Sequence, residues 1–333
     1  MIFLHNKSGR PIHYFIAALV ALVVSNTVGV AAKKTNNSSA LFKLPVWVLP
    51  NGNPPLQELS VNEFQINHGK LRVEPTSLRS PNSPTLLFVA FDTVGEIANI
   101  MEARTALIHE IQGLGNQYWV GLISANEPIT IAQEPTPARE LLSEKIGQLS
   151  QIGKAGLLDT LLPVADLATS VLLKTDVRVA VIFITDSDIG NYKTDYLNAP
   201  VNASDSRDLS RRFAGRALQE KITRMSKAIS KFQVPIIVVH IAPGEDPLNR
   251  AYQNGLKQLA EIGGGKCLLS KSMGDISSTL HEAFEWAQSF YLLGFRLTAA
   301  KGHFADIEIT LVPKEAHTIG TYRLVHPNKI YMP

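Results

Sequence analysis

Three stretches of the chain consist almost entirely of apolar residues, and they constrain the fold more than any other feature. They are Thr85–Phe91 (TLLFVAF), Val177–Thr185 (VRVAVIFIT) and Val234–Ile241 (VPIIVVHI). A strand without a polar face is buried on both sides, which is typical of a central strand in a parallel sheet. We therefore predict that the three segments lie side by side in one parallel sheet. The turns that follow them would then gather at a common edge.

Segments with helical spacing alternate with these strands. Apolar residues recur every three or four positions in Ile97–Gly113, Ala138–Leu149, Leu157–Leu173, Arg211–Phe232, Asn249–Ile262 and Ile276–Gln288. Shorter apolar runs predict further strands at Tyr118–Ser124, Ile129–Ala132 and Lys266–Leu269. Strands and helices that alternate in this way predict an α/β fold. We expect a Rossmann-like, doubly wound and mostly parallel sheet with helices on both faces.

The segments before and after this region have the texture of β structure. PVWVLP (residues 45–50) indicates a short strand, and NEFQINHGKLRVEP (62–75) indicates two strands joined at His68-Gly69. After the last helix, FYLLGFRLT, FADIEITLV and TYRLVHP predict a three-stranded antiparallel unit. Because both segments flank the same core, we expect them to form one small antiparallel β module. The predicted organisation is a linker and β segment at 33–83, an α/β domain at 84–288 and a C-terminal β segment at 289–333 that packs with the N-terminal one.

The N-terminus has the layout of an export signal. Residues 1–14 are polar and basic without an acid, residues 15–24 read FIAALVALVV, and Val30-Ala31-Ala32 precedes Lys33. The apolar run is shorter than the ~20 residues that a membrane-spanning helix needs. We predict that residues 1–32 are a signal peptide and that the protein is secreted or resides in the periplasm or cell envelope. An uncleaved signal, which would leave an N-terminal anchor, is the alternative and the one membrane contact we expect.

Charge and cysteine content exclude several classes of function. The formal net charge is +3, and Lys7 and Arg10 of the predicted signal supply two of these charges. The remainder is near neutral, so we expect no nucleic-acid partner. Cys267 is the one cysteine, which rules out an internal disulfide and a Cys/His zinc site. Gly263-Gly264-Gly265 follows a helix, so we interpret it as a helix cap and turn in preference to a phosphate loop. Among the histidines, His240 at the end of an apolar strand is the one we consider as a ligand or site residue, although we favour the interpretation that it is a hydrogen-bonded core histidine.

The loops after the apolar strands carry a further pattern. Phe91-Asp92-Thr93-Val94-Gly95-Glu96 follows the first strand, Gly153–Asp159 (GKAGLLD) begins a helix, and Ile184-Thr185-Asp186 ends the second strand. In order and spacing these segments resemble three landmarks of the von Willebrand factor A (VWFA) domain. VPIIVVHIAPGED and LKQLAEIGGGKCLLSKSMGDISSTL resemble that family's closing stretch, so the resemblance covers about residues 84–288. In the flanks, LSVNEFQI with Gly69-Lys70 and FYLLGF resemble the secreted bacterial VWFA-related proteins.

The resemblance implies a degenerate metal-ion-dependent adhesion site. In the family, oxygen ligands from three loops hold a hard divalent cation, and a partner's acidic side chain completes the site. Asp92 and Asp186 keep two of the ligands, whereas Val94 and Glu96 stand in place of two serines and Ala155 in place of a threonine. The candidate metal residues are Asp92, Glu96, Asp186 and Asp188. They form either a cluster of solvated or hydrogen-bonded acids or a remodelled cation site. Carboxylates that converge without a cation repel one another, which is the reason to consider a remodelled site. We expect no cofactor beyond weakly bound Mg²⁺ or Ca²⁺.

These features predict an exported, non-enzymatic interaction module of the adhesion or scaffold type, which binds a protein partner that the sequence does not identify. The predicted binding rim consists of Asp92, Thr93, Val94, Glu96, Lys154, Ala155, Asp186, Ser187 and Asp188, with Asn191–Asp208 as additional surface. Two alternatives stay open. One is a metal-assisted enzyme that uses the cluster of Asp92, Glu96 and Asp186. The other is a structural subunit of an envelope assembly that docks through the β module.

Overall fold

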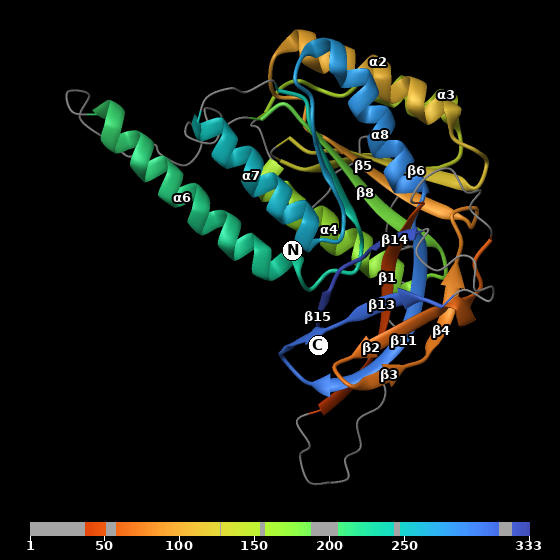
Figure 1. Ribbon diagram of the computed structural model, residues 1–333. Coiled ribbons are helices and arrows are strands. Elements are labelled where there is room, and N and C mark those ends of the chain that lie inside the picture. Colours follow the sequence, from red (N-terminus) through yellow and green to blue (C-terminus); the bar gives the residue numbers. More distant parts are fainter. Residues whose placement is uncertain are drawn as a thin grey trace, which may run out of the picture. The chain divides into compact units, whose positions relative to one another are not determined.

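The computed structural model describes residues 37–50, 58–126, 128–153, 157–187, 206–242, 247–312 and 322–333. Residues Asn37–Pro333 form one compact unit (Figure 1). The predicted signal at residues 1–32 lies outside the described residues. None of the helices in the described part of the chain combines the length and the apolar composition of a membrane span.

A six-stranded sheet forms the centre of the fold. Its order is β10-β9-β8-β5-β6-β7. In chain order these strands are β5 (Thr85–Phe91), β6 (Tyr118–Ser124), β7 (Thr130–Thr136), β8 (Arg178–Thr185), β9 (Ile236–His240) and β10 (Cys267–Leu269). Strand β8 lies between β5 and β9 and is parallel to both, so the predicted arrangement of the three apolar segments is confirmed. Every residue of β8 and β9 is buried, which explains why neither strand has a polar face.

Strand β7 is the antiparallel edge of this sheet. It pairs with β6 alone and extends to Thr136, four residues beyond the predicted Ile129–Ala132. Pro135, which cannot donate a backbone hydrogen bond, is tolerated because edge strands leave donors unpaired. The prediction of a mostly parallel sheet is confirmed with this one antiparallel strand.

Helices cover both faces of the sheet (Figure 1). One face carries α2 (Ile97–Gly113), α3 (Arg139–Gly147) and α8 (Ile276–Gln288), and the other carries α4 (Leu157–Lys174), α6 (Ser206–Ile229) and α7 (Pro247–Ile262). All six predicted helices are present. The largest difference is at α6, which begins five residues earlier and ends three residues earlier than its apolar spacing predicted.

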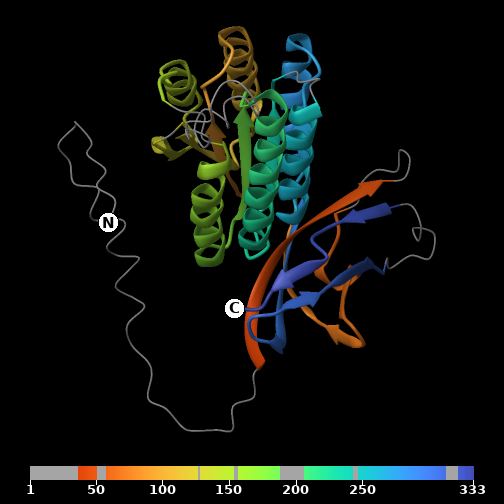
Figure 2. The same ribbon diagram turned by 90° about the vertical axis from the view of Figure 1, so that its left-hand side faces the viewer.

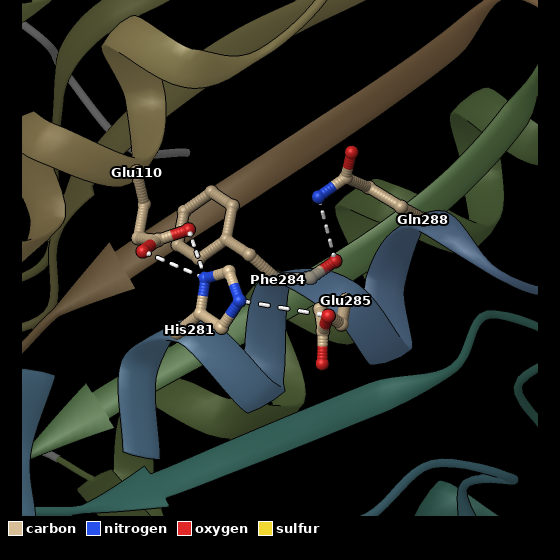
Figure 3. A network of polar contacts seen from close by, with 5 residues as sticks. All are labelled: Glu110, His281, Phe284, Glu285 and Gln288. Atoms are coloured by element: carbon tan, nitrogen blue, oxygen red, sulfur yellow. Dashed lines mark hydrogen bonds and ion pairs between the residues drawn. The ribbon is translucent and has the colours of Figure 1, made fainter. Parts of the chain in front are cut away.

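A surface cluster joins α2 to α8 (Figure 3). The Nδ1 atom of His281 lies 3.1 Å and 3.3 Å from the two carboxylate oxygens of Glu110, and its Nε2 atom lies 3.5 Å from Oε1 of Glu285. The two carboxylates flank opposite sides of the imidazole, so they cannot converge with it on one metal ion. We interpret the cluster as a set of surface polar contacts that connect the two helices.

The N- and C-terminal flanks interleave to form the β module. Strand β1 (Asn37–Pro50) pairs antiparallel with β11 (Tyr291–Ala300), from Asn37 opposite Ala300 to Val46 opposite Tyr291. The last residues of β1 then pair with β14 (Tyr322–Val325), and β4 (Pro75–Arg79) pairs with the other side of β11. The resulting order, β14-β1-β11-β4, confirms that the two flanks share one antiparallel module.

Two smaller sheets complete the module. One has the order β13-β2-β3 and contains β2 (Phe64–His68), β3 (Leu71–Val73) and β13 (Glu308–Leu311). The other pairs β12 (Phe304–Asp306) with β15 (Lys329–Tyr331). The predicted turn at His68-Gly69 joins β2 to β3, and Gly69 has a φ of +58°, a left-handed conformation that suits glycine. The predicted boundaries at 84 and 288 stay predictions, because both sides belong to one compact unit.

The predicted three-stranded unit of the C-terminal segments is wrong. FADIEITLV divides at Ile307 into β12 and β13, and β13 pairs with β2, while β11 pairs with β1 and β4. Alternation identified the strands but could not identify partners from the other end of the chain. The N-terminal prediction was also too short, because β1 begins at Asn37, eight residues before Pro45. Strand β4 was not predicted.

Strand β1 belongs to two hydrophobic cores at once. Phe42, Leu44 and Val46 pack in the core of the β module, whereas Trp47 packs with the helices and the central sheet. Side chains alternate between the two faces of a strand, so one residue step suffices for this switch. The Trp47 indole donates to the carbonyl of Trp286 at 2.9 Å and stacks on that ring at 5.0 Å. Trp47 therefore joins the β module to α8.

Candidate functional site

The predicted acidic residues meet at the carboxyl edge of the central sheet. Asp92 follows β5 and Asp186 follows β8, and these two strands are neighbours. The backbone N–H of Asp92 donates to the carbonyl of Ile184 at 2.8 Å, which extends the ladder by one residue. Both side chains are buried: Asp92 is 0% and Asp186 is 5% exposed. The arrangement of the two loops at one edge is therefore as the sequence predicted.

The Asp186 carboxylate caps helix α2. Its Oδ2 atom accepts the backbone N–H of Glu96, the N-cap residue of α2, at 2.6 Å, and its Oδ1 atom accepts the Asn99 side-chain amide at 3.3 Å. A Cβ atom at Gly95 would overlap the Asp186 carboxylate, so only glycine fits there. Helix N-termini carry partial positive charge and unpaired N–H groups that stabilise an anion. The charge of Asp186 is thus matched by α2 itself.

The Asp92 carboxylate is also hydrogen-bonded within the protein. Its Oδ1 atom accepts the backbone N–H of Val94 at 3.1 Å, and its Oδ2 atom accepts the hydroxyl of Thr185 at 3.0 Å. Glu96, in contrast, is exposed at the start of α2. The three acids that the sequence grouped therefore occupy two environments. Two are buried and bonded to the protein, and one faces solvent.

A chain of hydroxyl groups leads from α7 to Asp92. The Tyr252 hydroxyl lies 2.8 Å from Oγ of Ser187, which lies 2.9 Å from Oγ1 of Thr185. The Thr185 hydroxyl donates to Asp92, and its oxygen accepts the backbone N–H of Ser187 at 3.0 Å. Either hydroxyl of the Ser187–Tyr252 pair can be the donor. The three hydroxyls thus connect α7 to the buried carboxylate.

His240, at the end of β9, supports the same loop. Its Nε2 atom lies 2.8 Å from the carbonyl of Ser187, so this nitrogen carries the proton and donates. The Nδ1 atom faces the side-chain amide of Gln253 at 3.5 Å, and the ring packs against Tyr252 with centroids 6.1 Å apart. His240 is 1% exposed. These contacts are those of a hydrogen-bonded core histidine, the interpretation that the sequence favoured.

Thr93 and Asn126 hold the neighbouring loop. The N–H of Thr93 donates to Oδ1 of Asn126 at 2.9 Å, and its hydroxyl donates to the carbonyl of Ser150. The Asn126 amide donates to the carbonyls of Ser150 at 2.9 Å and Ile152 at 3.3 Å. Thr93 was predicted to be part of the binding rim, but its side chain is buried. It positions the rim and does not present a surface to a partner.

The remaining predicted site residues divide into two groups. Ser187 is buried and Val94 is half-buried, whereas Lys154, Ala155 and Asp188 lie outside the described residues, as does most of Asn191–Asp208. Within the described residues, no three His, Cys, Asp or Glu side chains are grouped so that they could hold a metal ion. The four-residue candidate site with Asp188 stays a prediction. Asp92 and Asp186 use all four of their carboxylate oxygens as acceptors from protein donors.

The sequence did not point to the uncharged residues around these acids. Asn99 on α2 bonds to Asp186, and Tyr252 on α7 reaches Asp92 through Ser187 and Thr185. Asn126, on the loop after β6, bonds to Thr93. Tyr252 reads as an ordinary apolar position of an amphipathic helix. One usable signal was polar: Asn99 falls in the first turn of a predicted helix, where side chains often serve the helix terminus.

The strand order and the two loop ends decide the fold family. Five parallel strands with one antiparallel edge strand, helices on both faces, and aspartates after adjacent central strands form the arrangement that the sequence resemblance implied. The fold is von Willebrand factor A-like. The VWFA-like body carries the β module on the amino side of its sheet, where Trp47 contacts α8.

Several solved structures are similar to this chain at low sequence identity. Neither a family model nor a curated protein sequence matches the chain. Among solved structures, the PilB minor pilin from Streptococcus sanguinis is similar, with 14% identity, a TM-score of 0.45, and coverage of 62% of this chain and 61% of that chain. A von Willebrand factor type A protein from Catenulispora acidiphila has 10% identity and a TM-score of 0.42, with coverage of 89% and 73% respectively. The vWF domain of the type V pili tip protein Mfa5 from Porphyromonas gingivalis has 10% identity and a TM-score of 0.40, with coverage of 61% and 94%.

Proposed function

We propose that this chain is an exported, non-enzymatic interaction module that binds a protein partner at the carboxyl edge of its VWFA-like sheet. The observation that carries the proposal is a group of exposed apolar side chains at this edge. Ile97 and Met101, one turn apart on α2, are 68% and 50% exposed, and Ile152, on the loop held by Asn126, is 87% exposed. Exposed apolar groups that gather in one region are typical of protein-binding surfaces.

The buried network below this surface supports the same function. The Asp186 carboxylate sets the start of α2, and Asn126 sets the loop that carries Ile152. Both elements are therefore held before a partner arrives. A preorganised surface loses less conformational entropy on binding, which increases affinity. Glu96, exposed beside Ile97, supplies a charge at the border of the apolar surface, as polar rims of interfaces commonly do.

We further propose that the metal site is degenerate and that the rim binds its partner without an ion. Hydrogen-bond donors from α2 compensate the charge of Asp186, and those from Val94 and Thr185 compensate the charge of Asp92. Converging carboxylates need a cation only when nothing else offsets their repulsion. The export that the N-terminal sequence predicts is part of the same proposal, and it places the partner in the cell envelope or outside the cell.

Site-specific photo-crosslinking tests the rim. A photoreactive amino acid replaces Ile97 in the full chain, which is expressed in the organism that it comes from. A second variant with the photoreactive amino acid at Leu173 is the control. Leu173 is a matched control because it is an exposed apolar helical residue, on α4, at the opposite end of the fold. We expect one discrete protein adduct from Ile97 and none from Leu173. When the crosslinker is placed at Met101 instead, we expect the same adduct, and the additional substitution I97D should abolish it.

Two outcomes would contradict the proposal. Equal crosslinking from Ile97 and Leu173 would show that the exposed residues capture proteins without specificity. An adduct from Leu71, an exposed residue of β3, with none from Ile97 would instead assign docking to the β module. The second result is the one that the structural-subunit alternative predicts.

A further inference from the structure

A groove of about 580 Å³ lies between the VWFA-like body and the β module, at the edge of the sheet opposite the rim. The C-terminal turns of α6 and α7 form one wall, and β12 with residues Val325–Lys329 forms the other. Both ribbon views show the C-terminal ends of the two helices facing the β module (Figure 1, Figure 2). Its volume is within the range of about 300–1,000 Å³ that is common for ligand sites. It is far from Asp92 and Asp186, because α6 and α7 end where β9 and β10 begin.

A tight glycine turn forms the end of this groove. After α7, Gly264 has a φ of +70°, and the N–H groups of Gly264 and Gly265 donate to the carbonyls of Glu261 and Ala260. This pair of bonds is the Schellman pattern that ends a helix with glycine. A Cβ atom on Gly264 would overlap the ring of Pro327, so the absence of a side chain lets the β module approach α7 closely. The two walls thus meet in direct contact and define the groove.

The lining of the groove combines apolar and basic groups. Ile262, Val325, Pro327 and Phe304 supply apolar surface, and the Phe304 side chain is 48% exposed. Phe304 packs edge-on against Tyr331 with ring centroids 5.4 Å apart, so its ring is held by a neighbour while one side faces solvent. An exposed aromatic ring in a hollow offers a ready contact for an apolar side chain of a ligand.

Three lysines surround this apolar surface. Lys227 and Lys329 line the groove from opposite walls, and Lys231, in the turn that follows α6, lies over the Tyr331 ring at 5.0 Å. Glu261 is the one acidic residue among the lining residues that the structure describes. Lys329 lies 3.8 Å from Asp306, and no ion pair to a carboxylate is present for Lys227 or Lys231 in the described part of the chain. The groove therefore has an excess of positive charge on a chain that is otherwise near neutral.

We propose that this groove binds an acidic segment of a partner polypeptide in extended form. An apolar side chain of the segment would pack against Phe304 and Ile262, and carboxylates on either side of it would pair with Lys227, Lys231 and Lys329. Charge complementarity argues for an acidic partner. The apolar floor argues for a peptide in preference to a polyanion that carries charge alone. This site is independent of the rim, since it uses the opposite edge of the sheet.

A displayed library of random octapeptides tests the groove with the purified chain that begins at Lys33. We expect enrichment of peptides that combine several Asp or Glu residues with one large apolar residue. The K227E/K231E double variant should bind the enriched peptides at least tenfold more weakly in fluorescence anisotropy. The K70E/K301E double variant, which reverses two exposed lysines outside the groove, should bind them as the unchanged chain does. F304S leaves the charge of the groove unchanged and should still weaken binding, because it removes the apolar contact.

Three results would overturn the proposal. One is enrichment of peptides without acidic residues, and the second is no saturable enrichment at all. The third is that an all-Asp octapeptide binds as tightly as the enriched peptides, since the site would then attract charge without recognising an apolar side chain. Anionic lipid vesicles serve as a separate arm, and vesicle binding that K227E/K231E abolishes, in the absence of peptide binding, would assign the surface to membranes instead. None of these results depends on I97D, so failure here and failure of the rim proposal are distinguishable.

Discussion

The guanidinium of Arg178 lies over the ring of Phe290, with its carbon 4.6 Å from the ring centroid, and also donates to the Phe290 carbonyl at 2.6 Å. The same side chain donates to the carbonyls of Gln288, the last residue of α8, and Pro81, and to the hydroxyl of Thr85. Arg178 is 0% exposed, and burial lowers the pKa of its guanidinium. Arg178 thus connects β8, α8 and the start of β11 at the amino edge of the sheet.

Replacing this arginine should be severely destabilising. In R178L the carbonyls of Phe290, Gln288 and Pro81, one buried and two partly buried, lose their charged donor. We expect the free energy of unfolding to fall by about 3–5 kcal/mol, as when one partner of a buried charged network is removed. Urea unfolding followed by circular dichroism measures the change. R296L, at an exposed position of β11, is the control and should change stability by less than about 0.5 kcal/mol. A loss below about 1 kcal/mol in R178L would contradict the role we assign.

The Asp186 cap predicts a local effect on α2. In D186A the N–H of Glu96 and the amide of Asn99 lose their acceptor, so we expect a loss of about 1–2 kcal/mol. Hydrogen exchange should accelerate most in the first turn of α2. D166A removes an exposed acid of α4 and should leave both quantities unchanged. Equal exchange of the α2 amides in D186A and the unchanged chain would argue against the cap.

The hydroxyl chain predicts coupling between Tyr252 and Ser187. Y252F removes the hydroxyl at the far end of the chain and should cost about 1 kcal/mol, because a hydrogen bond to a buried network is lost. S187A interrupts the chain in its middle, and the double variant should cost less than the sum of the two single variants. A double-mutant cycle from chemical unfolding measures this difference. Strict additivity would mean that the two hydroxyls do not act through one chain.

The proposal of a degenerate metal site predicts that divalent cations do not stabilise the protein. A site with a Kd of about 0.1 mM would add about 2.7 kcal/mol at 10 mM ion. We expect the Tm to stay within about 1 °C on addition of 10 mM MgCl₂ or CaCl₂. The V94S/E96S/A155T variant, which restores the side-chain types of the VWFA family, should gain a saturable response. A saturable increase in the Tm of the unchanged chain would instead support the remodelled site of Asp92, Glu96, Asp186 and Asp188.

Cys267 predicts slow thiol chemistry. Burial raises the pKa of its thiol to about 12; Lys257 opposes this shift, and Glu261 adds to it. At pH 8 only about one thiol in 10⁴ is ionised, and the thiolate is the reactive form. Labelling with a thiol reagent should therefore be far slower in buffer than in 8 M urea. Because the folded-state pKa lies above the unfolded value, this group's contribution to stability is complete below about pH 9 and is lost as the pH rises toward 12.

The apolar pattern was sufficient for the central sheet because its cause is local. Strands β5, β8 and β9 are buried on both faces, and that burial favours apolar residues at almost every position, which is visible in the sequence itself. The placement of Asp92 and Asp186 at one edge follows, since parallel strands end on the same side. The partners of β11 and β13 do not follow in this way. Their pairing with β1 and β2 joins residues more than 240 positions apart, and alternation is the same whichever partner a strand has.

The amino-acid sequence by itself determined the strands and helices of the α/β core, its doubly wound sheet and the edge at which the acidic loops meet, because periodicity and burial are properties of each segment. Tertiary structure alone decided what those acids do. Whether Asp186 faces a cation or the start of α2, and whether Asp92 meets Thr185 or solvent, depends on side chains that arrive from other elements. The tertiary structure also decided that α7 and the C-terminal strands enclose a basic groove. Such sites are built from residues that have no relation in the sequence and become neighbours only through packing.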